Sequence, residues 1–250
     1  MVSKRALITG ASSGIGRAMA MALDHENFEL FLVARRENKL RDLKTEIKKA
    51  KVHLIVSDVT AADFPSKVKD ATGADLDILI NNAGLALGRE KVESADFSDF
   101  QQMIDVNITG AFRLVHLVLP WMLRKGGGDI INLCSVAGHY TYQGGSVYCA
   151  TKHAVKAFTR VLREETCGKN IRVMQISPGM VQTEFSEVRF RGDKKAADTV
   201  YQGMTPLTGE DIARMMKFML DQPRHVVIDE IITMPQDQGS PTVVHRSGKA

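Results

Sequence analysis

The sequence predicts a single-domain α/β fold of the doubly wound type, with a seven-stranded parallel sheet and helices on both faces. Seven short apolar runs alternate with segments whose apolar residues repeat at helical spacing. Near-continuous apolar strands are typical of parallel sheets that are buried on both faces. A glycine-rich turn joins the first run to the first helix, as in many folds of this type. A chain of 250 residues can form one such domain, and no linker, repeat or low-complexity stretch divides it.

The positions of the elements follow from the same pattern. The apolar runs predict strands at 6–9, 30–33, 52–56, 78–80, 130–133, 173–176 and 231–233. Helical spacing predicts helices at 17–23, 40–47, 106–123, 146–165 and 209–220. Pro120 is expected to kink or loosen the last turn of the helix at 106–123. In a doubly wound sheet, ligands bind outside the carboxyl ends of the strands where the strand order reverses. The turns that follow the strands are therefore the predicted location of the functional site.

The first predicted strand leads into the sequence TGASSGIG at 9–16, and an Ala- and Met-rich helix follows. Glycines let a backbone turn tightly and approach a pyrophosphate, while a helix N-terminus supplies N–H groups and a positive dipole end. The spacing G-x-x-x-G-x-G departs from the commoner G-x-G-x-x-G, so the generic dinucleotide fingerprint is not strictly matched. The turn nevertheless predicts a dinucleotide site. Its residues are Gly10, Ser12, Ser13, Gly14, Ile15 and Gly16.

Tyr148 and Lys152 are four residues apart and share one face of the helix predicted at 146–165. Ser135 follows the strand predicted at 130–133. A free phenol, with a pKa of about 10, exchanges protons poorly at neutral pH, but a neighbouring cation favours the phenolate. We therefore expect Lys152 to lower the pKa of Tyr148, and Tyr148 to exchange a proton with a carbonyl or alcohol oxygen held by Ser135. Such a Tyr–Lys pair is common by chance, and its weight comes from the glycine-rich turn upstream.

Five motifs, taken in order along the chain, resemble the short-chain dehydrogenase/reductase family. They are TGxxxGIG at 9–16, NNAG at 81–84, Ser135, YxxxK at 148–152 and PG at 178–179. The resemblance spans nearly the whole chain and implies a Rossmann-type fold that binds a nicotinamide cofactor. It implies that Ser135, Tyr148 and Lys152 are catalytic, and that Tyr148 and Lys152 also contact the cofactor. Asn107 matches the asparagine that completes the group by holding a water near the lysine, a role compatible with a residue at a helix bend.

Three further segments resemble one branch of this family, the NADP-dependent 3-hydroxy acid dehydrogenases. They are NAGLALG at 82–88, TEFSEVRFRG at 183–192, and Met234-Pro235 with His245-Arg246. The branch implies oxidation of serine, allo-threonine and related 3-hydroxy acids, or reduction of the 3-oxo compounds, at Ser135 and Tyr148. Residues 180–205, here called the lid, lack strong periodicity and are expected to cover the site. In the lid, Arg189 and Arg191 are candidates to clamp a substrate carboxylate, with surface charges or subunit contacts as the alternative.

The residues after the second predicted strand favour NADP(H) over NAD(H). An acidic residue about 20 positions after the glycines would bind a ribose 2′-hydroxyl, whereas arginine accommodates a 2′-phosphate. This chain has Arg35 and Arg36 at that place, although two exposed loop arginines would give the same pattern. The resemblance implies that Asp58 contacts the adenine, with a surface turn aspartate as the alternative. It further implies cofactor contacts by Val59, Asn82, Ala83, Gly84, Pro178, Gly179, Val181 and Thr183.

Composition agrees with the family resemblance and argues against some other classes of protein. The formal net charge is +4 with basic residues spread along the chain, which argues against nucleic-acid binding. No apolar run approaches the roughly 18 residues of a membrane span, and residues 1–4 lead directly into the first strand. Cys134, Cys149 and Cys167 show neither metal-ligand spacing nor even pairing, as is usual in a reducing compartment. We therefore expect a cytoplasmic protein without a metal or a membrane segment.

Two other functions are compatible with the motifs. A carbonyl reductase for a ketone, pterin or 3-oxoacyl thioester would use the same catalytic group and differ in the lid. A non-catalytic NADP-sensing protein would keep the fold and lose the chemistry, which the presence of Ser135, Tyr148, Lys152 and Asn107 disfavours. The family resemblance implies a homotetramer, with the helices at 106–123 and 146–165 between subunits. The C-terminal tail at 236–250 has no clear pattern and is expected near the lid or a neighbouring subunit.

Overall fold

The computed structural model describes residues 3–248 and contains a fully parallel sheet. Its strands are β1 (Lys4–Thr9), β2 (Phe28–Ala34), β3 (Lys51–Val56), β4 (Ile78–Asn81), β5 (Gly128–Leu133), β6 (Ile171–Pro178) and β7 (Glu230–Thr233). The seven strands lie in the order β3-β2-β1-β4-β5-β6-β7, which confirms the predicted fold class. The order reverses between β1 and β4, so the carboxyl ends of these two strands flank the crevice where such folds bind ligands.

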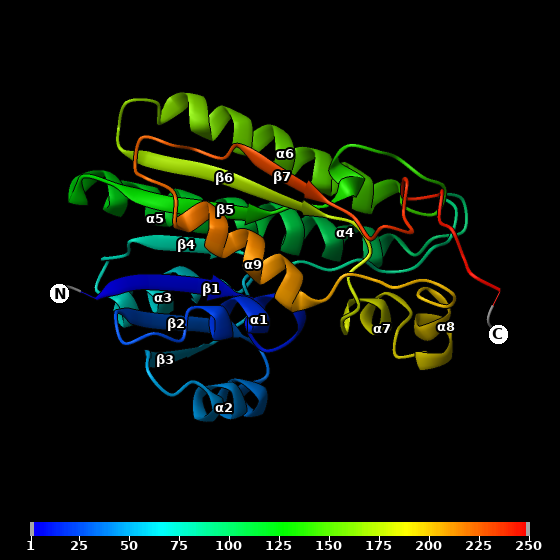
Figure 1. Ribbon diagram of the computed structural model, residues 1–250, viewed down its shortest axis with the longest axis horizontal. Coiled ribbons are helices and arrows are strands. Elements are labelled where there is room, and N and C mark those ends of the chain that lie inside the picture. Colours follow the sequence, from blue (N-terminus) through cyan, green and yellow to red (C-terminus); the bar gives the residue numbers. More distant parts are fainter. Residues whose placement is uncertain (1–2, 249–250) are drawn as a thin grey trace.

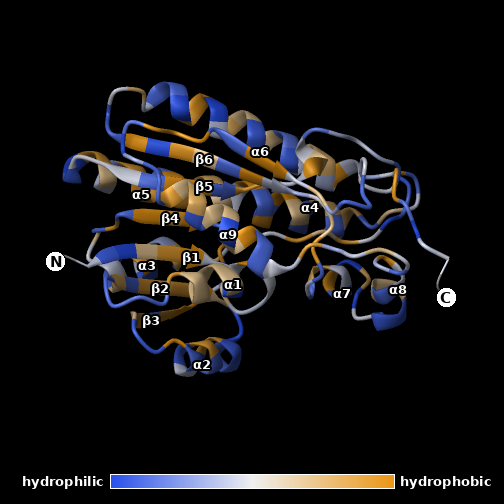
Figure 2. Cartoon of the chain, in the orientation of Figure 1, coloured by the Kyte–Doolittle hydropathy of each residue, from blue (hydrophilic) through white to orange (hydrophobic). Residues whose placement is uncertain are grey.

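Helices cover both faces of the sheet (Figure 1). On one face lie α1 (Gly14–Ala22), α2 (Glu37–Glu46) and α9 (Gly209–Leu220). On the other face lie α3 (Phe64–Thr72), α5 (Ala111–Lys125) and α6 (Ser146–Glu165). Alternate strand residues feed the two cores: Ala6 and Ile8 of β1 pack into the first, and Leu7 packs into the second. Figure 2 shows the resulting apolar strands between helices whose outer turns are polar.

One helical stretch is longer than the sequence predicts. It consists of α4 (Phe97–Ile104), a π-helical turn η1 (Asp105–Gly110) and α5. The prediction began this helix at 106 and missed both α4 and the change of helix type. A π-helical turn inserts an extra residue per turn and is frequent at functional sites. The helix continues past Pro120 to Lys125, and the kink or loosening expected at Pro120 stays a prediction.

The same stretch is apolar enough to be compared with a membrane span. Within Phe97–Lys125, a window of 18 residues has a mean hydropathy of 1.3, which differs from the expectation that no segment approaches this length. However, 44% of that window is buried inside the protein. Core helices with no relation to membranes pass the same test of length and composition, so this helix is a weak indication of a membrane span.

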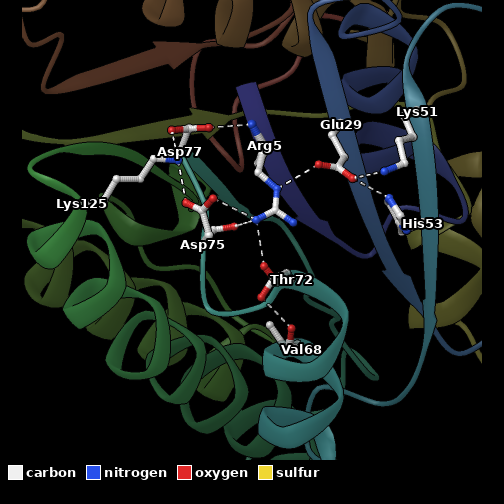
Figure 3. A network of polar contacts seen from close by, with 9 residues as sticks. All are labelled: Arg5, Glu29, Lys51, His53, Val68, Thr72, Asp75, Asp77 and Lys125. Atoms are coloured by element: carbon white, nitrogen blue, oxygen red, sulfur yellow. Dashed lines mark hydrogen bonds and ion pairs between the residues drawn. The ribbon is translucent and has the colours of Figure 1, made fainter. Parts of the chain in front are cut away.

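An ion-pair network joins the amino-terminal halves of β1, β2 and β3, at the end of the sheet away from the crevice (Figure 3). Arg5 of β1 donates to Glu29 of β2 at 2.9 Å and to the Thr72 carbonyl oxygen at 2.9 Å. Lys51 and His53 of β3 contact the other oxygen of Glu29. The hydrogen bond from Lys51, opposed by burial and helped by His53 and Arg5, lowers the pKa of Glu29 to about 2. Glu29 is therefore a charged junction between three strands.

The lid contains two short helices that the sequence pattern did not predict, α7 (Phe185–Arg189) and α8 (Lys194–Thr199). They lie beyond the carboxyl ends of the strands (Figure 1). A hydrogen bond closes the base of the lid, since the N–H of Leu207, two residues beyond the lid, donates to the Met180 carbonyl oxygen at 3.0 Å.

The C-terminal tail packs on the lid, one of its two expected positions. Arg246 donates to the Val200 carbonyl oxygen at 3.0 Å, and the Asp237 carboxylate accepts from the Thr205 N–H at 3.0 Å. Residues 249 and 250 of the predicted tail lie outside the described residues. So do residues 1 and 2 of the lead-in to the first strand.

Candidate active site

A cavity of about 330 Å³ lies at the carboxyl ends of the central strands. Ser135 and all nineteen positions predicted to contact the cofactor line it, from Gly10 in the first turn to Thr183 in the lid. The cavity also has lining residues that the sequence did not single out. They are Val33, Ala34, Ser57, Leu85, Val106, Leu133, Cys134, Glu184, Phe185 and Val188. Residues from Gly10 to Thr183, which are 173 positions apart, therefore form one site.

The glycine-rich turn brings backbone into the floor of the cavity. Gly10 and Gly14 have φ values of +66° and +52°, a region that other residues rarely adopt. A side chain on Gly16 would place its Cβ 2.4 Å from the Gly10 carbonyl oxygen, so the turn can close this tightly because residue 16 has none. The Thr9 hydroxyl accepts from the N–H groups of Asn82 and Ala83, which fixes the turn against the end of β4. Thr9 is buried and was not predicted to have this role.

Two arginines stand at one edge of the cavity. Arg36 donates to the hydroxyl oxygens of Ser12 at 3.2 Å and Ser13 at 2.8 Å, and therefore faces the glycine-rich turn. Arg35 lies 3.5 Å from a carboxylate oxygen of Asp58. Burial raises the pKa of Asp58, but hydrogen bonds from Thr60 and the charge of Arg35 outweigh it, and the net pKa is lowered. This edge therefore carries the cationic donors that a phosphate group would require.

The predicted acid/base residues meet at the other end of the cavity. Tyr148 and Lys152 project from α6, and both are buried. The Lys152 Nζ lies 5.9 Å from the centre of the Tyr148 ring and donates to the Leu133 carbonyl oxygen at 3.0 Å. Ser135 begins the short turn η2 (Val136–Gly138), where its hydroxyl oxygen accepts from the Ala137 N–H at 3.1 Å. Each side chain is thus held by its own element and directed to a shared space.

The pKa of Tyr148 differs from the sequence prediction. Burial raises it above its ordinary value, and nearby Tyr142 raises it further, whereas Ser135 and Arg189 lower it. Burial likewise lowers the pKa of Lys152. The expectation that Lys152 pulls the phenol down was wrong for this structure, because the loss of water around a buried phenolate outweighs the cations near it. Tyr148 is therefore a neutral phenol, which is the proton-donating form.

Asn107 lies in the π-helical turn η1, behind the wall of the cavity. Its Oδ1 accepts from the Leu85 N–H at 2.8 Å, and its Nδ2 donates to the Leu85 carbonyl oxygen at 2.8 Å and to Thr151 Oγ1 at 3.1 Å. A second cavity of about 10 Å³ is bordered by both Asn107 and Lys152. A space of this size is of the order of one water molecule. The arrangement is thus compatible with the predicted water near the lysine. It also includes Thr151, which the sequence analysis did not name, although its place three residues after Tyr148 on the same helix could have suggested it.

The two lid arginines have different surroundings. Arg189 lies 5.9 Å from the centre of the Tyr148 ring and donates to Gly88 O, Tyr142 Oη and Gly144 O at 3.1–3.2 Å. Arg191 instead forms an ion pair with Asp99 of α4. Neither arginine lines the two cavities described above, but Arg189 shares a further small cavity with Tyr148. Arg191 is therefore not placed to clamp a substrate, because its guanidinium is committed to α4. Arg189 stays a candidate beside the phenol.

Among residues 3–248, no group of three His, Cys, Asp or Glu side chains is arranged to hold a metal ion. The three cysteines are free thiols, with Cys134 and Cys149 buried and Cys167 exposed. Cys134 lines the cavity, where burial raises the pKa of its thiol. Cys134 therefore fills space beside Ser135 as a neutral side chain.

Comparison with known proteins identifies similar chains over nearly the whole length. The sequence model for the family described as "short chain dehydrogenase" matches residues 4–194. The chain is 43% identical to the NADP-dependent 3-hydroxy acid dehydrogenase of Schizosaccharomyces pombe, covering 97% of this chain and 96% of that one. It is 40% identical to the serine 3-dehydrogenase of Agrobacterium fabrum, covering 93% and 94%. Its structure resembles the closed form of a serine dehydrogenase complexed with NADP+, with a TM-score of 0.88, 35% identity, and 97% and 100% of the chains covered.

Proposed function

Because the chain belongs to the short-chain dehydrogenase family of oxidoreductases, we propose that it uses NADP(H) to oxidise a small 3-hydroxy acid, such as serine or allo-threonine, or to reduce the corresponding 3-oxo compound. The observation that carries this proposal is the convergence of Ser135, Tyr148 and Lys152 on a cavity that continues to the glycine-rich turn and to Arg36. The names of relatives at 40–43% identity support the substrate class.

The residues present fit such a cofactor. Gly10, Gly14 and Gly16 keep side chains out of the floor of the cavity, and α1 begins there, so N–H groups and a positive helix end are available to a pyrophosphate. Arg35 and Arg36 would hold a 2′-phosphate, and Asp58 would lie near the adenine. When bound, the nicotinamide would supply or accept the hydride.

The chain's own residues would manage the proton. Tyr148 donates its hydroxyl proton to the carbonyl oxygen during reduction and takes one from the hydroxyl group during oxidation. Ser135 would hold that oxygen by a hydrogen bond, since its hydroxyl lines the same cavity. Lys152, which donates to the Leu133 carbonyl oxygen, keeps a positive charge near the developing phenolate. Asn107 and the small cavity beside Lys152 would connect the lysine to a water.

Arg189 supports an acidic substrate. A guanidinium has five N–H donors, and three of them are used by Gly88, Tyr142 and Gly144. Within the part of the chain that the structure describes, two donors are left, next to the phenol that would receive the substrate oxygen. A carboxylate bound there would place the neighbouring carbons of a short hydroxy acid toward Tyr148. We propose Arg189 as the carboxylate contact.

The test is a screen of NADPH and NADP+ absorbance changes with serine, allo-threonine, 3-hydroxypropionate and a neutral aldehyde such as propanal. We expect the acids to be turned over, and Arg189→Ala to raise KM for the acids about tenfold or more while changing propanal reduction little. Arg191→Ala, on the same lid but paired with Asp99, is the matched control and should behave as wild type. Absence of turnover of every acid, or equal effects of the two variants, would contradict the proposal.

We also propose a cytoplasmic homotetramer. The family resemblance supports this assembly, with α5 and α6 between subunits. Light scattering of the purified protein tests it, and a monomer at micromolar concentration would contradict it.

A further inference from the structure

Besides Asp58, a second acidic side chain lies among the basic groups at the arginine-lined edge of the cavity. Glu184 is the residue immediately before α7, and its carboxylate accepts a hydrogen bond from Arg36 Nη1 at 2.7 Å. Its other oxygen contacts the Lys39 ammonium on α2. These partners are 148 and 145 positions away in sequence, so the contact joins the lid to the region after β2. An acid is unexpected at an edge that would otherwise attract anions.

The same guanidinium serves the proposed cofactor site. Arg36 lines the cavity and also holds the hydroxyls of Ser12 and Ser13 in the glycine-rich turn. Glu184 lines that cavity too. Burial raises the pKa of Glu184, but hydrogen bonds from Lys39 and Arg36 outweigh this and lower it, so the carboxylate is charged at neutral pH. A negative charge therefore stands where the 2′-phosphate would bind.

We infer that Glu184 and the cofactor's 2′-phosphate compete for Arg36 and Lys39, so that binding of NADP(H) releases the start of the lid. The inference rests on the proposed NADP(H) dependence. A phosphate monoester carries a charge of about −1.5 to −2 at neutral pH. The phosphate therefore binds the two cations more strongly than a single carboxylate does. Repulsion between the two anions also favours departure of Glu184. NAD(H) has a neutral hydroxyl at this position and leaves the contact intact.

The lid transmits this exchange toward the reacting groups. Glu184 is directly followed by α7, a helix of five residues that ends at Arg189. Arg189 holds Gly88 and Gly144 and lies beside the Tyr148 ring. Release of Glu184 therefore frees one end of α7 while the other end stays attached beside the phenol. Glu184 is a residue that determines cofactor affinity and couples it to the lid, without contacting the reacting atoms.

Binding of two probes to the protein without cofactor tests the competition. We would titrate wild type and Glu184→Gln with adenosine 2′,5′-bisphosphate and with 5′-AMP by calorimetry. Loss of the competing carboxylate should tighten the bisphosphate about tenfold, in line with one charge-assisted hydrogen bond, and change 5′-AMP less than about twofold. The gain should shrink with added salt, because the groups are partly exposed. Glu187→Gln, the same charge change three residues later within α7, is the control and should leave both affinities unchanged.

Hydrogen exchange of the lid gives a readout that is independent of affinity. In wild type, the bisphosphate should speed exchange of the amides at 184–189, whereas 5′-AMP should not; in Glu184→Gln the exchange should already be fast. Unchanged or weaker bisphosphate binding by Glu184→Gln, or slower exchange of α7 on adding the bisphosphate, would overturn the inference. If wild type binds the bisphosphate no better than 5′-AMP, the proposed NADP(H) dependence fails as well. If it strongly prefers the bisphosphate and Glu184→Gln does not differ, the cofactor proposal stands and the role of Glu184 does not.

Discussion

The Lys152 ammonium lies 5.9 Å from the centre of the Tyr148 ring, and it donates its hydrogen bond to the Leu133 carbonyl oxygen instead of the phenol. Both side chains are buried at the inner end of the cavity. The lysine thus lies over the phenol ring without donating to its hydroxyl. Burial is the largest influence on both pKa values: it raises the pKa of Tyr148 and lowers the pKa of Lys152.

The raised pKa of Tyr148 predicts how the two directions depend on pH. A phenol whose pKa is raised keeps its proton throughout the neutral range, so carbonyl reduction should have a kcat that is flat between about pH 6 and 8 and falls only at higher pH. Oxidation needs the phenolate, so its kcat should rise over the same range. Initial rates in both directions across this range check the prediction. A reduction rate that falls from about pH 6 upward would contradict it.

Arg35 and Arg36 predict the preference between cofactors. Replacing both with alanine removes charge-assisted hydrogen bonds of about 1.5–3 kcal/mol each, so NADPH affinity should fall at least tenfold while NADH affinity stays nearly constant. Arg41→Ala is the control, since Arg41 is an exposed arginine of α2 paired with Glu37. Fluorescence titration with both cofactors measures the ratio. An undiminished preference for NADPH in the double variant would show that these arginines do not determine the choice of cofactor.

Glu230 predicts a positioning effect on Ser135. Its Oε1 accepts from Gln175 at 2.6 Å and from Ser177 and His139, and His139 directly follows the turn that Ser135 begins. Burial raises the pKa of Glu230, but these hydrogen bonds outweigh it and keep the carboxylate charged. Glu230→Ala should therefore lower kcat about tenfold through misplacement of Ser135, with Glu230→Gln partly restoring it and cofactor affinity unchanged.

Asp229→Asn is the matched control for Glu230, since it removes a neighbouring charge that pairs with Arg163 of α6 and does not reach the Ser135 turn. Steady-state kinetics and cofactor titration of the three variants separate the cases. Equal kcat values in Glu230→Ala and Asp229→Asn would refute a positioning role.

Glu29 predicts how stability depends on pH. Its pKa falls from 4.5 to about 2 in the folded protein, so its contribution to stability is complete above the unfolded value and is lost as the pH drops through the folded value. Glu29→Gln should lower the free energy of unfolding by about 1–3 kcal/mol at neutral pH. The difference from wild type should shrink in acid. Urea denaturation at several pH values measures this, and a difference that does not depend on pH would be inconsistent with the network in Figure 3.

The sequence predicts the frame of this protein well because its strands are buried on both faces. Apolar runs such as 78–80 have no other stable location, and the turns after them necessarily meet at one edge of a parallel sheet. The residues that line the cavity, many of them implied by the family resemblance, could therefore be located without coordinates. The motif identifies Asn107 but not its π-helical turn or its contacts with Leu85 and Thr151, which come from distant segments.

The pKa shifts and the ion-pair partners of the charged residues were harder to predict from the sequence. The effect of Lys152 on Tyr148 seemed favourable from spacing alone, but burial, which a sequence does not display, reverses the direction of the pKa shift. Arg191 could not be separated from Arg189 by composition, because its pairing with Asp99 joins residues that are 92 positions apart. Glu184 could not be identified from the sequence for the same reason, since its partners Arg36 and Lys39 are 148 and 145 positions away.

Tyr148→Phe isolates the role of the phenol in catalysis, because it removes the hydroxyl that would exchange the proton and keeps the ring packed against its neighbours. The measurement combines turnover of a 3-hydroxy acid or its 3-oxo counterpart with NADPH binding by fluorescence. We predict a loss of kcat of about a hundredfold or more, with NADPH affinity within about twofold of wild type. Wild-type turnover by Tyr148→Phe would contradict the account.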